Sequence, residues 1–186
     1  TSGDLNTAVG HQAGALITTG VSNTILGHGA MDATPVAAGN NVAIGTSAMG
    51  GASSAQTASD YNVAIGSGSM GGVLNEADRN VAVGYLSLAG LTEGDHNVAI
   101  GGNSGAQLTT GGDNIIIGRA AGYEMTTEAS CVLVGHNAGA ALTETTANGT
   151  TAVGYSALAA LTDGAGNTAV GYTAGTTLTT GERNTI

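Results

Sequence analysis

A five-residue phrase of the type Asn-Val-Ala-Ile-Gly recurs along the whole chain. Besides the copy at residues 97–101, clear copies begin at Asn6, Asn41, Asn62, Asn80 and Asn167, weaker copies begin at Asn23, Asn114, Cys131 and Thr150, and a truncated copy begins at Asn184. Successive copies begin 17 to 21 residues apart, a period too long for a coiled-coil heptad and too short for a two-helix repeat. The period therefore favours a solenoid in which each repeat forms one coil.

The strand of each coil follows from the pattern inside the phrase, which we number from its first residue as slot zero. Slot three always holds Val, Leu or Ile, and slot four is Gly in all ten complete copies. Because side chains alternate along a strand, slots one and three share a face, and we expect this apolar face to point inward. The expected core ladder consists of Val9, Leu26, Ile44, Ile65, Val83, Ile100, Ile117, Val134, Val153 and Val170.

A second short strand is predicted over slots seven to eleven. Slot seven is always Ala or Ser, and slot eleven is usually apolar, with Ile17, Val73, Leu91, Leu108, Met125, Leu142, Leu161 and Leu178. In an extended chain these slots share a side, so the small residues would pack against the large aliphatic residues of the first strand. The opposite face of the first strand, slots two and four, is mostly Ala and Gly, and we expect it to pack on neighbouring chains.

These features predict an all-β protein, a parallel β-solenoid of about ten coils of 17 to 21 residues that forms one repeat domain over residues 1–186. Coils stacked about 4.8 Å apart would make a rod about 48 Å long. The longer repeats carry their additional residues between Gly50 and Tyr61 and around residues 145–149, outside the phrase itself. Because the chain begins and ends within repeats, we expect a fragment of a longer fibre that lacks its caps.

Composition excludes several classes of partner. Three basic residues stand against thirteen acidic ones, with a net charge of -10, which leaves no electrostatic basis for binding nucleic acid. No apolar run is long enough to cross a membrane, so we expect no membrane insertion. Cys131 is the single cysteine, which excludes an internal disulfide and a thiolate zinc cluster, and in a slot usually held by Asn it is expected to be an inert thiol.

No catalytic constellation stands out, and we predict that the chain is not an enzyme and carries no cofactor or metal site. Residues 66–71 match Gly-x-Gly-x-x-Gly, but the repeat accounts for each glycine and no helix is expected after them. Asp60, Asp78 and Asp95 each lie two residues before a repeat, where turn-capping acids are expected and adventitious calcium is the alternative. The acids are scattered among turns rather than paired in a cleft, as glycoside hydrolysis requires.

Slot five, directly after the strand glycine, forms a possible contact stripe of rings and one cation. Its members are His11, His28, Tyr85, Arg119, His136, Tyr155 and Tyr172. Two interpretations stay open: polar side chains that stack along an edge of the rod, or amphipathic rings along which a glycan or another partner could lie. Neighbouring coils pair two histidines in this slot only at His11 and His28, which disfavours metal ligation.

The phrase at residues 97–101, followed three residues later by Ser104, resembles the head repeats of trimeric autotransporter adhesins, the YadA-like left-handed parallel β-roll. The longer phrase at residues 167–181 looks still more like the repeats of phage tail fibres and related bacterial surface proteins. The resemblance covers essentially the whole chain and implies a homotrimeric fibre on a virion or cell surface. Its implied role is attachment, by displaying or forming a receptor-contacting surface. A glycan-binding module that uses the slot-five stripe is the alternative.

Overall fold

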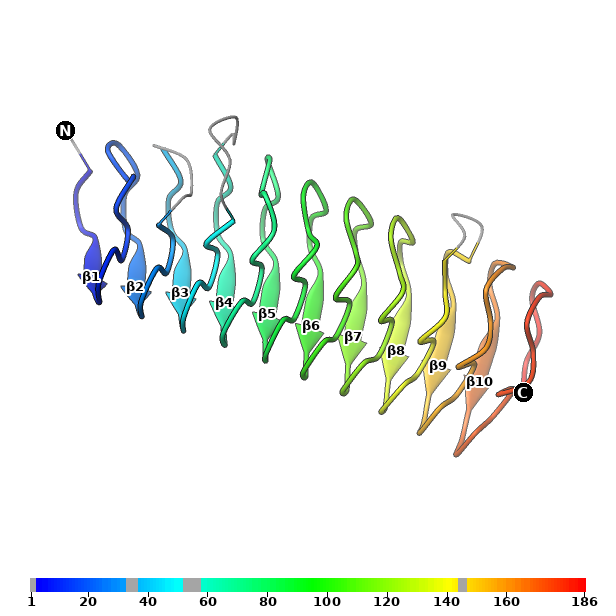
Figure 1. Cartoon of the computed structure of the whole chain (residues 1–186). Coiled ribbons are helices and arrows are strands. Elements are labelled where there is room, and N and C mark those ends of the chain that lie inside the picture. The colour runs from blue at the N-terminus through cyan, green and yellow to red at the C-terminus, as the bar shows by residue number, and fades with distance from the viewer. Residues whose placement is uncertain (1–2, 33–36, 52–57, 144–146) are drawn as a thin grey trace.

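The structure, a computed structural model, describes residues 3–32, 37–51, 58–143 and 147–186. The chain winds into a rod of stacked coils, and every coil places one short strand on the same side of the rod (Figure 1). The two termini lie at opposite ends of the rod. None of the described residues belongs to a helix. The prediction of an all-β parallel solenoid is therefore confirmed.

Ten strands of three residues each form a single sheet in chain order. They are β1 (Thr7–Val9), β2 (Thr24–Leu26), β3 (Val42–Ile44), β4 (Val63–Ile65), β5 (Val81–Val83), β6 (Val98–Ile100), β7 (Ile115–Ile117), β8 (Val132–Val134), β9 (Thr151–Val153) and β10 (Thr168–Val170). Neighbouring strands pair in parallel with equal slots opposite each other, so that Ile44, Ile65, Val83 and Ile100 stand in one column. The predicted register of the repeats is confirmed.

The inward face of the sheet is the opposite of the predicted one. The middle residue of every strand from β2 to β10, at slot two, is buried, whereas slot three points outward, with Val9 57%, Ile100 40% and Val170 62% exposed. The predicted placement of the ladder of Val9, Leu26, Ile44, Ile65, Val83, Ile100, Ile117, Val134, Val153 and Val170 in the core is therefore wrong. The slot-two alanines, expected to face neighbouring chains, instead line the interior of their own coil.

Large side chains that enter the core from the turn explain this reversal. Slot eight holds a buried Met or Leu in five coils, at Met31, Met49, Met70, Leu88 and Leu158. Four coils combine Ala at slot two with Met or Leu at slot eight. Three of them are consecutive, namely those that begin with β3, β4 and β5. Where slot eight is Gly, a large strand side chain fills the core instead. A Cβ on Gly122, for example, would lie 2.9 Å from Cδ1 of Leu133, which belongs to β8 in the next coil. Close packing fixes the volume of the core. A small strand residue can therefore mark the inside of a coil whose turn supplies a large side chain.

The predicted second strand is absent from the described residues, because turns occupy its place. Slots six and eight have positive φ in every complete repeat, as in Asn103 (57°) and Met70 (47°). The slot-seven amide donates to the slot-four carbonyl, as from Ser104 to Gly101 over 3.3 Å. A positive φ at the third residue of such a turn is the mark of a type II turn, and an extended strand cannot contain it.

Slots seven and eleven nevertheless line the core, as predicted. Ala48, Ser87 and Leu108 are fully buried. In the coil that begins with β4, Leu74 is buried and Val73 is 38% exposed, so the assignment of Val73 to the core is wrong by one position. The additional residues predicted between Gly50 and Tyr61 and around residues 145–149 lie partly outside the described residues.

Candidate functional site

The slot-five residues lie at the first position after each strand glycine, and the structure brings them together in two groups. The rings of His11 and His28 stack with their centroids 5.2 Å apart. Arg119, His136, Tyr155 and Tyr172 come from the four consecutive coils that begin with β7 to β10. Tyr85 lies apart from both groups, because Ser67 and Gly102 hold this slot in the coils on either side. The predicted stripe is thus interrupted.

His136, Tyr155 and Tyr172 form one stack, which Arg119 extends through a hydrogen bond to His136, and we name these four residues the ring column. The rings of His136 and Tyr155 lie 5.2 Å apart and 10° from parallel, and those of Tyr155 and Tyr172 lie 5.3 Å apart and 13° from parallel. The guanidinium of Arg119 lies 3.1 Å from Nε2 of His136. Because a guanidinium can only donate, Nε2 is the acceptor of this hydrogen bond.

The ring column presents ring edges rather than ring faces to a partner. Parallel stacking covers the faces between neighbouring coils, while Tyr155 remains 48% and Tyr172 78% exposed. The phenol hydroxyls can donate and accept hydrogen bonds, and Arg119 adds its remaining N–H donors and a positive charge. The arrangement therefore suits hydrogen bonding to an extended polar chain better than stacking of sugar rings on open aromatic faces.

A second surface, the outer sheet face, is formed by slots one and three of β1 to β10. All of its residues are Val, Ile, Leu or Thr, and no charged residue occurs in the ten strands. Leu26 is 48% and Ile115 42% exposed on it. Large apolar patches on a protein surface usually mark a contact with another molecule. Sequence reasoning missed this surface because it assigned the same residues to the core.

The asparagines that open the repeats form a buried ladder along the start of the strands. The backbone amide and Nδ2 of Asn97 donate to Oδ1 of Asn80 over 2.9 and 3.1 Å, and Nδ2 also donates to the carbonyl of Gly111 over 2.9 Å. Asn114 repeats these bonds to Oδ1 of Asn97. Sequence reasoning used these residues only as repeat markers. The sequence does contain a signal for this ladder, because an amide side chain recurs at one slot next to a buried strand, where every polar group needs a partner.

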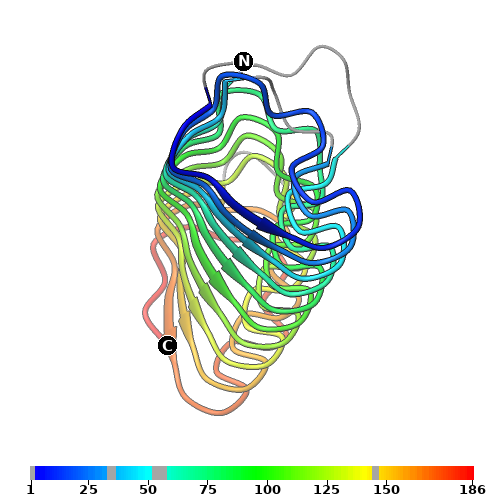
Figure 2. The same ribbon diagram turned by 90° about the vertical axis from the view of Figure 1, so that its left-hand side faces the viewer.

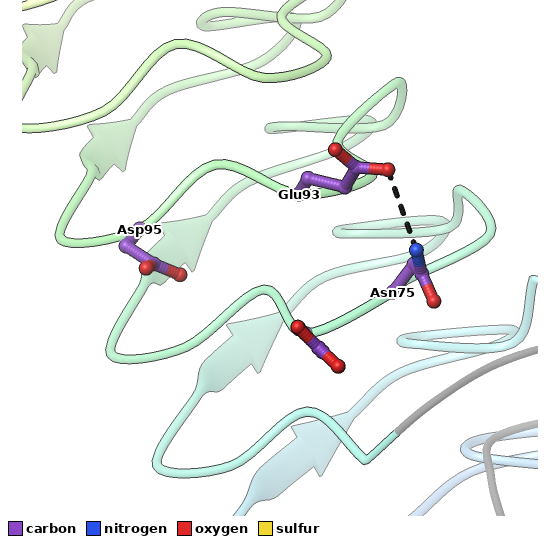
Figure 3. A pocket seen from close by; sticks show the side chains of 4 residues that line it. Asn75, Glu93 and Asp95 are labelled. Carbon is purple, nitrogen blue, oxygen red and sulfur yellow. Dashed lines mark hydrogen bonds between the residues drawn. The ribbon is translucent and has the colours of Figure 1, made fainter.

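The acids before the strands form a shorter ladder of their own. The carboxylates of Asp60, Asp78 and Asp95 each accept the backbone amide of the preceding coil over 2.7 Å. They cap turns as predicted, but across coils. Asn75, Glu76, Glu93 and Asp95 line a polar pocket beside them, in which Nδ2 of Asn75 donates to Glu93 over 3.3 Å (Figure 3). Within the described residues, no three His, Cys, Asp or Glu side chains are placed to hold a metal ion, and adventitious calcium stays a prediction.

Cys131 replaces Asn in the buried ladder. Burial raises the pKa of its thiol to about 11, although the backbone amides of Thr150 and Gly149 lower it in part and the charge of Glu128 raises it further. The sulfur lies 3.6 Å from the carbonyls of Ala129 and Ala147. Because the thiolate is the reactive form, a buried thiol with a raised pKa fits the expected inert side chain.

Comparison of the chain with protein-family models, with curated proteins and with solved structures finds no match. Among the described residues, no helix is long and apolar enough to span a bilayer. Two surfaces of the chain, the ring column and the outer sheet face, are therefore the candidate sites for function.

Proposed function

We propose that the chain is a segment of a homotrimeric extracellular or virion fibre that acts in attachment. In this proposal the solenoid is a left-handed β-roll that gives the fibre its length, and its surface displays or forms a receptor contact. The observation that carries the proposal is the outer sheet face, whose slot-three residue is aliphatic in every strand from β1 to β10 and which is partly open to solvent in the single chain.

The outer sheet face needs a partner with the same length and the same repeat. Its slot-three side chains recur once per coil along the entire sheet, and Val9, Ile65 and Val170 are exposed members of this row. A second copy of the chain, parallel and in register, would match this spacing at every coil. Burial of apolar surface contributes about 25 cal/mol per Å², so modest gains at each coil add up along the rod.

The number of chains and the handedness have separate support. Three copies follow from the resemblance to trimeric fibre repeats. Left-handed winding is supported by Figure 2, in which the N-terminal end faces the viewer and the chain turns counterclockwise as it recedes. The resemblance also carries the location on a virion or cell surface.

The molecular mass in solution, measured by light scattering after size-exclusion chromatography, tests the proposal. We expect three times the chain mass for the wild type and a shift toward the single-chain mass for Ile100→Lys, which places a charge at the centre of the outer sheet face. Ile100 is 40% exposed in the single chain, so the variant should keep its fold by circular dichroism. The matched control is Tyr85→Lys, at a side chain that is 60% exposed outside this face. A monomeric wild type at all concentrations would refute the proposal.

A second candidate function is glycan binding through the ring column. The exposed edges of Tyr155 and Tyr172, in line with Arg119, favour it because they form a row of hydrogen-bonding groups at the spacing of the coils. The variants Tyr155→Ala and Tyr172→Ala should lose binding to glycans or cells, while Tyr85→Ala should not. Unchanged binding by a folded rod that lacks both rings would reject this candidate.

A further inference from the structure

We infer that Tyr155 and Tyr172 form an oxidative cross-linking site, at which the two phenol rings are joined as dityrosine. The link would covalently staple the coil that begins with β9 to the coil that begins with β10. This inference concerns a modification of the chain itself and stands apart from the proposed role in attachment.

The geometry of the pair favours coupling within one chain. The two ring centroids lie 5.3 Å apart and the ring planes differ by 13°. Both residues occupy slot five, directly after Gly154 and Gly171, and their strands pair in register. The stack therefore holds the two rings together before oxidation, and coupling requires the side chains to turn until two ortho carbons meet. With exposed fractions of 48% and 78%, both rings are open to an oxidant in solution.

The chemistry requires a one-electron oxidant, for which we name hydrogen peroxide activated by a peroxidase. Each phenol loses one electron and its hydroxyl proton, which gives two tyrosyl radicals. The radicals combine through one carbon–carbon bond between carbons ortho to the hydroxyls. Each of these carbons then releases its hydrogen as a proton, and each oxygen takes a proton back. The two electrons and two protons that leave the pair reduce one hydrogen peroxide to two waters.

The other tyrosines of the chain provide internal controls. Tyr85 is 60% and Tyr61 55% exposed, so both are as open to oxidants as the pair. Tyr85 has no ring at its slot in the neighbouring coils, and the ring of Tyr61 lies beneath the guanidinium of Arg79, 5.5 Å from its centroid. Among the described rings, the stacked contact between two tyrosines is that of Tyr155 and Tyr172. Exposure alone therefore does not predict the cross-link, but stacking does.

The test treats the full chain at low concentration with hydrogen peroxide and a peroxidase, followed by denaturing electrophoresis and peptide mass spectrometry. We expect a band at the mass of one chain that yields a linked peptide pair containing Tyr155 and Tyr172, lighter than the two peptides by two hydrogens. Tyr172→Phe keeps the stacked ring but removes the hydroxyl, so this link cannot form, and links from Tyr155 to any other tyrosine should be roughly tenfold or more rarer than the wild-type link, because no other phenol is pre-positioned. Tyr85→Phe should leave the yield unchanged.

Three outcomes would overturn the inference. The first is oxidation of the tyrosines without the linked peptide in the wild type. The second is an equal loss of the link in Tyr85→Phe. The third is a link that forms as readily in chemically denatured chain as in the folded rod, since the stack would then play no part. None of these outcomes depends on the oligomeric state, which the mass measurement determines separately.

Discussion

The two ends of each strand are held by different kinds of ladder. At the start of the strand, buried side chains bond from coil to coil, and this ladder accepts replacements at Cys131 and Thr150. At the end of the strand, slot four is glycine in all ten complete repeats. The backbone amide of Cys131 still donates to Oδ1 of Asn114 over 2.9 Å, and the hydroxyl of Thr150 donates to Ala147 over 2.8 Å. A hydrogen-bonded ladder thus tolerates other side chains, whereas a backbone ladder tolerates none.

The glycine ladder is strict for two reasons that act together. Gly101 has a φ of +132°, and a Cβ added to it would lie 2.7 Å from the carbonyl carbon and oxygen of Gly118 in the next coil. The backbone conformation disfavours an L side chain, and the neighbouring coil leaves no room for one. Substitutions at the two ends of the strand test this contrast.

The largest effect is expected for Gly101→Ala. The added methyl group meets the backbone of Gly118, which cannot move away without breaking the sheet, so we expect a loss of more than about 4 kcal/mol in the free energy of unfolding. Chemical denaturation measures it. The control is Gly171→Ala, where φ is +142° but the nearest atom to the added Cβ is Cβ of Ala174 at 3.8 Å. Equal losses in both variants would mean that φ alone, and not the contact between coils, makes glycine necessary.

A smaller loss is expected for Asn97→Ala, in the middle of the asparagine ladder. The backbone amide and Nδ2 of Asn114 lose their shared acceptor, and the carbonyl of Gly111 loses a donor, which should cost about 3 kcal/mol of unfolding free energy. Asn6→Ala removes equivalent bonds at a half-buried position. Because water can replace those bonds, its cost in the same denaturation experiment should be clearly lower. A similar cost at both positions would argue against burial as the source of the effect.

The buried thiol of Cys131 in the asparagine ladder should make the stability of the chain depend on pH in the alkaline range. The pKa of Cys131 rises from 9.0 to about 11 in the folded chain, so above pH 9 the unfolded chain binds fewer protons than the folded one and stability falls. The loss is complete above pH 11 and amounts to at most about 2.7 kcal/mol. Unfolding measured between pH 8 and pH 11.5 should show this slope in the wild type but not in Cys131→Ala. The same slope in both proteins would assign it to other groups.

The smallest effect is a gain in stability from Cys131→Asn. An amide at this position could accept the Thr150 amide on Oδ1 and donate to Ala147, whose carbonyl lies 3.6 Å from the sulfur. Repair of the ladder should add about 1 kcal/mol, seen as a higher midpoint of thermal unfolding. Cys131→Ser is the control, since its hydroxyl is too short for both bonds. A lower midpoint for the Asn variant would show that the ladder cannot continue into this coil.

The strand positions and their register could be predicted from the sequence, because the phrase repeats with one strand per copy and stacking in register follows from the period. The side of the strand that faces inward could not. Both faces of the strand are apolar or small. The large aliphatic residues at slot three, such as Ile44 and Ile100, wrongly favoured that face as the inward one. The deciding information lay in the turn, where Met49 and Met70 occupy backbone positions with positive φ that few large residues adopt.

The candidate site was predicted in part. Slot five placed Tyr155 and Tyr172 at equivalent positions, and the structure stacks them. The separation of Tyr85 also follows from the sequence, through Gly102 in the next coil. The outer sheet face could not be found, because it depended on the direction of the strand side chains. The asparagine ladder was within reach of sequence reasoning, since a repeated amide next to a buried strand needs a repeated partner.

The interior of each coil is filled partly by its neighbours. A Cβ on Gly105 would meet Cδ1 of Ile116 at 2.9 Å and Cδ2 of Leu88 at 3.0 Å, from the coils on either side. One coil therefore cannot replace another, although all coils share the same phrase. Deleting or transplanting one of them would leave a hole or a collision at both junctions, so a shortened or lengthened rod would have to be designed from groups of coils whose contents already complement one another.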